Sequence, residues 1–217
     1  MRMALLGPPG SGKGTQATRI CETFGLVHLS SGDILRTEKM AGTPAGFKIR
    51  DFIDNGLLVP DDLMLQVMRS KIISLKDVGF VLDGFPRTLP QAQTLNQMLF
   101  ELNCPLNLVL NFVVNPKALA MRFAGRRICP VCLTVYHVTG NPPQVAGVCD
   151  NDGETLITRE DDLPEVVEKR IGTYQETMAP VIAFYAQLGN FKTVDTTGSV
   201  EEVTKLVLDK IRRHFDE

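Results

Sequence analysis

The sequence has no long apolar run, no strong excess of charge of either sign and few cysteines. Its 217 residues carry 23 lysines and arginines against 25 aspartates and glutamates, a formal net charge of -2. A chain this close to neutral does not hold nucleic acid through its overall field. The apolar run at residues 3–6 is too short for a membrane span or a signal peptide, so we expect a cytoplasmic protein that binds neither membranes nor nucleic acid.

The composition is that of an ordinary globular protein, 44% hydrophobic and 22% charged. A chain of 217 residues suffices for one main domain with inserts, and we find no internal repeat or low-complexity segment in it. The cysteine count is five, an odd number, and three of the cysteines fall between residues 129 and 149. This distribution favours a metal site in a reducing compartment over a disulfide framework.

A glycine-rich stretch at residues 7–15, Gly-Pro-Pro-Gly-Ser-Gly-Lys-Gly-Thr, follows the first apolar run and precedes a helical pattern. Strand, loop and helix in this order are typical of a phosphate-binding loop, because glycines let successive N–H groups point at an anion and the helix start adds partial positive charge. Lys13 supplies a mobile charge for the outer phosphates. Gly14 stands where the general pattern has Ser or Thr. Glycine has no hydroxyl, so the pattern does not assign a magnesium ligand to this position. A glycine-rich turn without a ligand is the alternative, and strand, spacing and lysine together disfavour it.

Short apolar segments alternate with helical patterns along most of the chain. We expect strands at residues 3–6, 26–29, 79–83, 106–114 and 191–195. The alternation predicts an α/β fold built on a P-loop, with a doubly wound parallel five-stranded sheet. The pattern fails at 126–163, where Cys, Gly, Pro and Asp replace periodic apolar residues, and it shortens to punctuated helical pieces at 30–59. We therefore expect a core of residues 1–29, 60–125 and 164–217, a small helical insert at 30–59 and a lid-like insert at 126–163.

Polar residues before the apolar patterns predict several helix ends. Asp61 and Asp62 can cap one helix, Thr88 starts another, Ser199 caps the last, and Pro180 should interrupt a helical run that begins at residue 164. The predicted buried stripes are Leu63, Val67 and Ile72 in one helix, and Val200, Val203, Val207 and Ile211 in the last.

Asp83 ends the apolar strand at 79–83, and open parallel sheets place their ligand crevice at the carboxyl ends of strands. Beside the glycine loop, its carboxylate is a candidate for holding Mg²⁺ through water. A plain Asp-Gly turn is the alternative.

Arginines gather beside glycine and turn residues rather than on helical ladders with acids. Any one of them suits a solvated surface position. As a set near a phosphate loop, they suit a site that brings two polyphosphate groups together, because guanidinium groups grip phosphate oxygens bidentately. The set is Arg36, Arg87, Arg122, Arg126, Arg127, Arg159 and Arg170.

Two knuckles of ligand-x-x-ligand spacing, Cys129 with Cys132 and Cys149 with Asp152, are separated by sixteen residues. Four such ligands suit a closed tetrahedral zinc site with a structural role. An empty reduced loop and a redox pair are alternatives, although a redox pair needs no second knuckle. A zinc ribbon that binds nucleic acid is a further alternative, but it leaves the glycine loop without a role, and the stretch has no dense basic and aromatic patch.

Together these motifs resemble the adenylate kinase family, in its long-lid bacterial form with a zinc-binding lid. The resemblance runs nearly end to end. It covers residues 7–15, Leu-Ser-Ser-Gly-Asp at 29–33, Asp-Gly-Phe-Pro-Arg-Thr at 83–88, Gly-Arg-Arg at 125–127, Tyr136-His137, Asn141-Pro142-Pro143 and Arg-Glu-Asp-Asp at 159–162. The family's own loop reads Lys-Gly-Thr, so Gly14 fits it, and the Asp-Gly-Phe-Pro-Arg string is specific to nucleoside monophosphate kinases.

The resemblance implies a phosphotransferase that moves the terminal phosphoryl group of MgATP to AMP, giving two ADP, with structural Zn²⁺ and as a monomer. The residues it implies for ATP are Gly10, Ser11, Gly12, Lys13, Gly14, Thr15, Arg122, Arg126, Val135, Tyr136 and Gly198. Those for AMP are Ser31, Arg36, Leu57, Leu58, Val59, Gly84, Phe85, Pro86, Arg87, Gln91, Arg159 and Arg170. The implied catalytic set is Lys13, Arg87, Arg126, Arg159 and Arg170, with Asp83 on Mg²⁺ and with Cys129, Cys132, Cys149 and Asp152 on zinc.

One position departs from the family, which usually has threonine where this chain has Ser31. Serine keeps the hydroxyl but loses a methyl contact that bears on adenine selectivity. The alternative within the class is a kinase for another nucleoside monophosphate, or one that uses GTP. Short-lid relatives that prefer pyrimidine monophosphates lack the insert at 126–163, and the presence of this insert here argues against that alternative.

Overall fold

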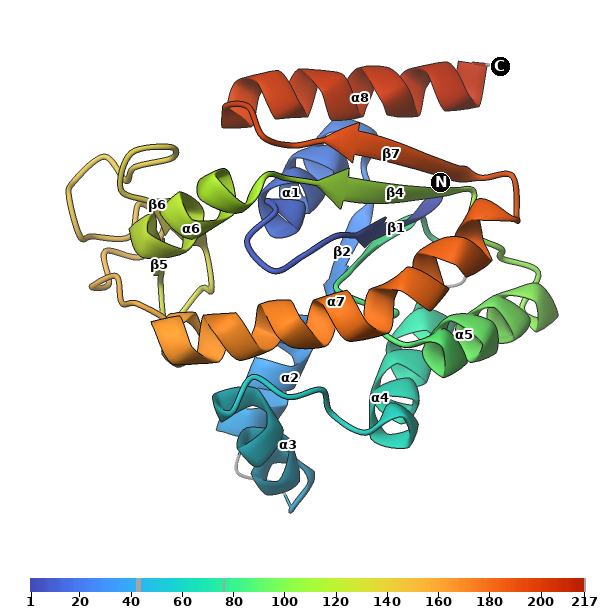
Figure 1. The fold of residues 1–217 in the computed structure, drawn as a ribbon, viewed down its shortest axis with the longest axis horizontal. Helices are drawn as coiled ribbons and strands as arrows, with labels where there is room; N and C mark the ends of the chain where they lie inside the picture. The colour runs from blue at the N-terminus through green and yellow to red at the C-terminus, as the bar shows by residue number, and fades with distance from the viewer. Residues whose placement is uncertain (42–43, 76, 217) are drawn as a thin grey trace.

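The computed structural model describes residues 1–41, 44–75 and 77–216 (Figure 1). Its centre is a five-stranded sheet in the order β2-β3-β1-β4-β7, and each neighbouring pair runs parallel. The strands are β1 (Arg2–Leu6), β2 (Val27–Ser30), β3 (Phe80–Asp83), β4 (Leu108–Val113) and β7 (Phe191–Asp195). The predicted α/β fold with a parallel five-stranded sheet is confirmed.

Helices cover both faces of the sheet, as in a doubly wound fold. One face carries α1 (Lys13–Phe24) and α8 (Val200–Asp216), which pack on Met3 and Leu5 of β1. The other carries α4 (Asp61–Ser74), α5 (Leu89–Glu101) and α7 (Pro164–Ala186), which pack on Ala4 and Leu6. Alternate residues of β1 thus face opposite layers, and both faces are buried, which explains why the strand reads as a continuous apolar run.

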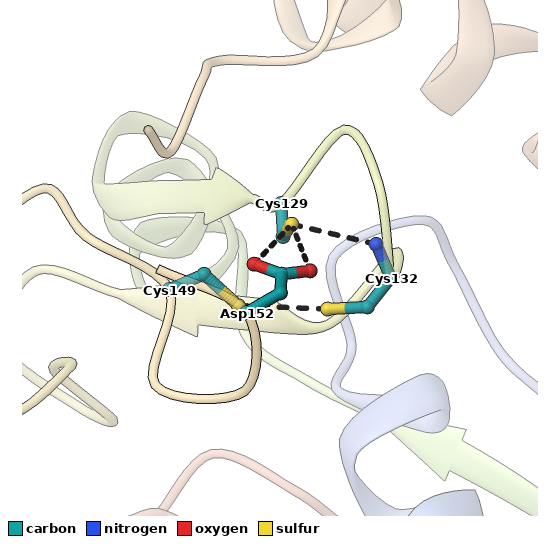
Figure 2. A group of neighbouring side chains, drawn as sticks. All are labelled: Cys129, Cys132, Cys149 and Asp152. Atoms are coloured by element: carbon teal, nitrogen blue, oxygen red, sulfur yellow. Dashed lines mark hydrogen bonds between the residues drawn. The ribbon is translucent and has the colours of Figure 1, made fainter. Parts of the chain in front are cut away.

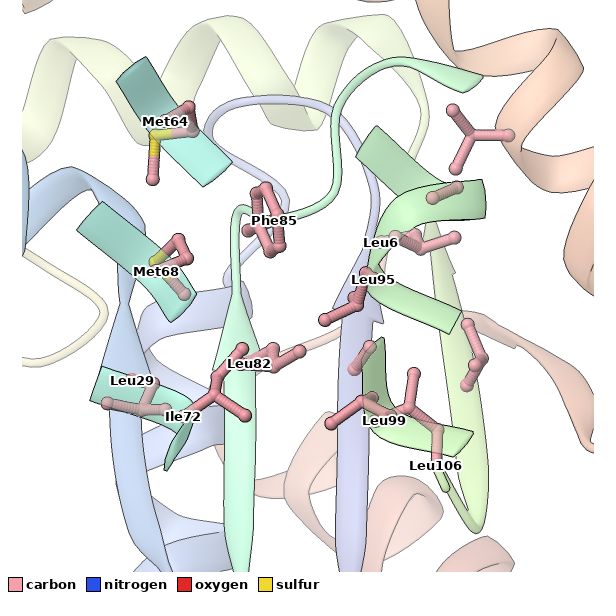
Figure 3. Close-up of a cluster of buried hydrophobic side chains, with 14 of the residues drawn as sticks. Leu6, Leu29, Met64, Met68, Ile72, Leu82, Phe85, Leu95, Leu99 and Leu106 are labelled. Atoms are coloured by element: carbon pink, nitrogen blue, oxygen red, sulfur yellow. The ribbon is translucent and has the colours of Figure 1, made fainter. Parts of the chain in front are cut away.

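Figure 3 shows the larger of the two cores, between the sheet and the layer of α4 and α5. Met64, Met68 and Ile72 of α4 are its buried stripe. The predicted stripe of Leu63, Val67 and Ile72 is therefore one residue out of phase over its first two positions. Leu63 and Val67 are only half-buried, and Met64 and Met68, which come one residue later, occupy the core-facing positions.

The predicted interruption at Pro180 is wrong, because α7 continues through Pro180 to Ala186. A proline inside a helix costs about 3 kcal/mol, since it lacks an N–H and its ring clashes with the carbonyl four residues back. Met178, Val181 and Tyr185 on the same helix are buried in the core. Burial contributes roughly 1.5–3 kcal/mol for each large apolar side chain, so packing outweighs the cost of the proline.

Two of the predicted helix caps are confirmed. The side chain of Thr88 accepts a hydrogen bond from the Gln91 backbone N–H at 3.3 Å at the start of α5. Ser199 accepts one from the Glu202 N–H at 3.3 Å at the start of α8. Val203, Val207 and Ile211 of α8 are buried as expected, whereas Val200 is half-buried.

The predicted cap at Asp61 and Asp62 is wrong. Both residues lie within the first turn of α4, after an N-cap at Pro60. The Asp61 carboxylate instead accepts hydrogen bonds from the Thr88 hydroxyl at 2.8 Å and from the Gln91 amide at 2.7 Å. The Asp61 carboxylate thus makes hydrogen bonds to residues far along the chain instead of capping the backbone N–H groups of its own helix.

Two groups of elements lie outside the layers of the sheet. Helices α2 (Ser31–Met40) and α3 (Pro44–Asp54) lie at the lower edge of Figure 1. After α6 (Pro116–Gly125), residues 126–163 contain a short antiparallel pair, β5 (Arg126–Ile128) with β6 (Val135–His137), and the 3₁₀ turn η1 (Glu160–Asp162). The sequence does not reveal these three-residue strands, since cysteine, glycine and proline surround them. The division into core and inserts remains a prediction.

Over the described residues, we find no helix with the length and apolar character needed to cross a membrane.

Candidate active site

The glycine loop lies between β1 and α1, at the carboxyl edge of the sheet. Gly7, Gly10 and Gly12 have φ values of 143°, 80° and 92°. A Cβ atom on Gly7 would lie 2.8 Å from the Phe112 carbonyl oxygen, so only glycine fits this turn. Gly12 is the N-cap of α1 and offers no side-chain cap, which leaves the first N–H groups of the helix for an anion.

Lys13 begins α1 and its side chain folds back over the loop. Its Nζ donates hydrogen bonds to the carbonyl oxygens of Gly7 at 2.7 Å and Pro8 at 2.8 Å. Burial lowers the pKa of Lys13 to about 7, although the carboxylate of Asp83 raises it and nearby arginines lower it further. An incoming phosphate would offer this ammonium group the counter-charge that the site provides only in part.

Asp83 stands at the carboxyl end of β3, directly beside the start of α1. Its Oδ2 lies 3.4 Å from where a Cβ atom on Gly14 would be, and 3.3 Å from His28 Nε2. Burial alone would raise the pKa of Asp83, but the hydrogen bond to His28 and the charge of Lys13 lower it overall. The carboxylate is thus held ionised against the phosphate loop, where a hydrated Mg²⁺ fits its charge.

Two cavities open along this edge of the sheet. The large cavity, of about 710 Å³, contains the glycine loop, Asp83, Arg122, Arg126, Val135, Tyr136 and Arg159 among its lining residues. The small cavity, of about 60 Å³, is lined by Ser31, Leu57, Leu58, Val59, Phe85 and Gln91, among others. Residues far apart in the sequence that were predicted for two ligands therefore gather around two adjoining spaces.

The lining of the large cavity is strongly cationic. Lys13 and seven arginines face three carboxylates, and of the arginines Arg36, Arg87 and Arg170 also line the small cavity. Burial and the charge of Arg170 lower the pKa of Arg87 to about 10. Burial and the charge of Arg36 likewise lower the pKa of Arg159 to about 10. Crowded, partly desolvated cations of this kind gain most from binding a polyanion.

Carboxylates of η1 hold two of the arginines in place. Asp162, whose side chain is fully buried, accepts hydrogen bonds from both Nε and Nη2 of Arg126, the former at 2.6 Å. Arg170 donates to the Asp161 carbonyl at 2.7 Å and pairs with the Asp161 carboxylate at 2.9 Å. Neither aspartate was predicted as a site residue. The available signal was the Arg-Glu-Asp-Asp string at 159–162, which by itself does not reveal which cations the acids would meet.

The small cavity has a hydrogen-bonded wall. Ser31 Oγ donates to the Gly84 carbonyl at 2.8 Å, and Arg87 Nε donates to the same oxygen at 2.6 Å. Gln91 accepts from the Arg87 backbone N–H at 2.8 Å while its amide group donates to Asp61. The orientation of the Gln91 side chain is fixed before any ligand binds.

Three predicted residues do not line the cavity of the ligand to which they were assigned. Pro86 and Arg159, predicted for AMP, line the large cavity rather than the small one. Gly198, predicted for ATP, is not among the lining residues; its carbonyl accepts a hydrogen bond from Arg122 Nη2 at 3.2 Å. Arg122 also donates to the Ser11 carbonyl at 3.1 Å, and it thereby ties the phosphate loop to the loop after β7.

The four predicted metal ligands form one cluster in the stretch between β5 and η1 (Figure 2). Their ligand atoms all lie within 4.8 Å of one another, with Cys132 Sγ 3.5 Å from Cys149 Sγ. A zinc ion with bonds of about 2.3 Å to sulfur needs sulfurs about 3.8 Å apart. The backbone N–H of Glu154 and the thiol of Cys149 lower the pKa of Asp152 to about 2, so the carboxylate is available as an ionised ligand. Three cysteines and a carboxylate at this spacing fit zinc.

A phosphate loop whose cavity adjoins a second one across shared arginines is the arrangement of a P-loop nucleotide kinase, and this is the class that the fold and the site define. Comparison with known proteins narrows the class, because the family model for adenylate kinase matches residues 5–190. An adenylate kinase of Acholeplasma laidlawii is 44% identical over 210 residues, 96% of each chain. One of Carboxydothermus hydrogenoformans is 42% identical over 215 residues, 98% of this chain and 100% of its own. One of Pyrococcus abyssi is 42% identical over 203 residues, 94% of this chain and 92% of its own. The chain belongs to the adenylate kinase family of phosphotransferases.

Proposed function

We propose that this chain transfers the terminal phosphoryl group of MgATP reversibly to AMP, giving two ADP, and so maintains the balance of adenine nucleotides. The single observation that carries this proposal is that Arg36, Arg87 and Arg170 line both cavities. Cations shared by two neighbouring spaces suit two phosphate groups that must meet. In this assignment ATP occupies the large cavity around the glycine loop, and AMP extends from the small cavity into the adjoining part of the large one, which Pro86 and Arg159 line.

No side chain is needed as a general base. The attacking oxygen belongs to the AMP phosphate, whose second pKa of about 6 leaves it largely ionised at neutral pH. The work of the protein is alignment and charge neutralisation, by Lys13 from the loop and by Arg87, Arg126, Arg159 and Arg170 around the transferred group. The crowding of these cations in one lining supports the assignment.

The two metals have separate roles in this proposal. Mg²⁺, when bound with ATP, would neutralise phosphate charge, and Asp83 is the residue that would hold it through water. Zinc would be held by Cys129, Cys132, Cys149 and Asp152. Four protein ligands leave no open position, so this ion would be structural, cross-linking a loop-rich stretch that has only a small apolar cluster of its own.

We further propose that residues 30–59 form the AMP-binding insert and residues 126–163 the lid, on a core of the remaining chain. The lid should close over both nucleotides before transfer, because ATP held beside open water would be lost to hydrolysis. We expect the protein to act as a monomer in the cytoplasm.

A coupled assay of ATP with AMP, CMP, UMP and GMP tests the acceptor. We expect AMP to be preferred by a wide margin, since Gln91 is held in one orientation in the small cavity. The Ser31→Thr variant is a matched control for the departure at that position, and it should sharpen the preference. Comparable efficiency with UMP or CMP would refute the assignment of AMP and favour a kinase for another nucleoside monophosphate.

A further inference from the structure

Hydrogen-bond donors surround the sulfur atoms of the metal cluster. Cys129 Sγ lies 3.4 Å from the backbone nitrogens of both Val131 and Cys132. Cys132 Sγ lies 3.7 Å from the Asn151 side-chain amide. A metal-bound thiolate has no proton and can only accept, so such donors stabilise the deprotonated ligand and fix its direction.

Cys149 has a donor of a different kind, the hydroxyl of Tyr136 on β6. The hydroxyl oxygen lies 3.5 Å from Cys149 Sγ, and the backbone N–H of Asp150 donates to that oxygen at 2.9 Å. Because the N–H occupies a lone pair, the hydroxyl proton is free to point at the sulfur. Tyr136 is 5% exposed and Cys149 is 2% exposed, so water competes little for this contact.

Tyr136 also connects the cluster with the nucleotide side of the molecule. Its ring packs with Cys129, Cys149 and Leu156 in a small apolar cluster of its own. The same residue lines the large cavity together with its strand neighbours Val135 and His137. A displacement of the second knuckle would therefore be transmitted to the strand that walls the cavity.

We propose that Tyr136 is a positioning residue of the metal site. Its hydroxyl donates to the Cys149 thiolate, holds the knuckle of Cys149 and Asp152 against β6, and keeps β6 in place at the wall of the large cavity. The inference rests on the proposed zinc site and, for its effect on ATP, on the proposed function.

The test compares Tyr136→Phe with Tyr185→Phe. Both changes remove one buried hydroxyl, but the Tyr185 hydroxyl, on α7 and in the core, has no hydrogen-bond partner among the residues that the structure describes. Loss of zinc from Tyr136→Phe to a chromogenic chelator should be about 10-fold faster or more, the usual range for losing a partner of a metal ligand. In cobalt-substituted protein its sulfur-to-metal charge-transfer band should move to lower energy, since the thiolate electrons are less stabilised. The KM for ATP should rise more than kcat falls. Tyr185→Phe should match the wild type in all three.

A second measurement does not depend on how Tyr136→Phe folds. Biosynthetic replacement of the three tyrosines with fluorotyrosine keeps every hydroxyl and makes each a stronger donor, so the cobalt band should move to higher energy. An unmoved band in fluorotyrosine protein, or a Tyr136→Phe variant that releases zinc as slowly as Tyr185→Phe, overturns the proposal. Wild-type protein that binds neither zinc nor cobalt but still transfers phosphoryl groups overturns it together with the metal site, while the kinase assignment survives. Protein that shows the expected band shifts but no transfer to AMP refutes the proposed function alone.

Discussion

Replacing Asp162 by asparagine should destabilise the protein more than any other isosteric change of a carboxylate in η1. The Asp162 side chain is fully buried and accepts two hydrogen bonds from Arg126, and it lies 3.3 Å from Arg170 Nη1. Removing one partner of a buried ion pair costs about 3–5 kcal/mol, because the other charge is left uncompensated. Arg126 keeps some exposure to solvent, 17% of its side chain, and Arg170 keeps Asp161, so we expect the lower end, about 3 kcal/mol.

For a chain of this length, 1 kcal/mol shifts the melting temperature by about 2–4 °C, so Asp162→Asn should lower it by about 6–12 °C. Thermal unfolding followed by circular dichroism measures this. Glu160→Gln is the matched control two residues away, since the Glu160 side chain is 77% exposed and its ion pair is with Lys39 at 2.9 Å. An exposed pair contributes about 0–1 kcal/mol, so the control should hardly move. Equal melting temperatures for the two variants would refute the claim that η1 anchors the arginines.

Four further outcomes are expected. Arg87→Ala should lower kcat/KM for phosphoryl transfer, because it removes about 3 kcal/mol of transition-state stabilisation. A variant with unchanged kinetics would contradict the assigned role. Cys149→Ser should release zinc and lower the melting temperature yet keep turnover at low temperature within a few fold, whereas loss of turnover in a folded lid would point to a catalytic metal. Because the pKa of Lys13 is lowered from 10.5 to about 7, the lysine is mostly neutral between these values and must gain a proton to hold phosphate. ATP binding at about pH 8.5 should therefore take up about one proton in calorimetry with two buffers, and none in Lys13→Arg, which is always charged. Lys39→Met removes ion pairs to Asp54 at 2.5 Å and to Glu160 at 2.9 Å, and it should destabilise by about 1 kcal/mol or less, an effect that fades at high salt; a loss independent of salt would contradict this.

The parts of this molecule that follow local rules were predictable from the sequence. The glycine loop, the strand that ends at Asp83 and the cap at Thr88 each depend on residues within a few positions of one another. The parallel sheet follows from the alternation of strands and helices, because short connections leave few other topologies. The cysteine spacing likewise predicted which four side chains would form one cluster.

The failures share a physical cause, which is competition from distant partners. Asp61 was expected at a helix cap and instead accepts hydrogen bonds from Thr88 and Gln91. Pro180 was expected to interrupt the helical run that begins at residue 164, but α7 continues through it because its residues on either side pack in the core. Asp162 was missed because its partner Arg126 lies 36 residues earlier in the chain. Propensity and spacing do not encode which of these long-range contacts prevails.

The central claim is that two nucleotides are held at once, with their phosphates meeting at arginines common to both cavities. The most direct test is the affinity of a bisubstrate mimic in which two adenosines are joined through one polyphosphate chain, measured by calorimetry beside ATP and AMP alone. The mimic pays the entropic cost of association once and occupies both cavities, so it should bind far more tightly than either nucleotide. An affinity no greater than that of ATP would contradict the two-site account.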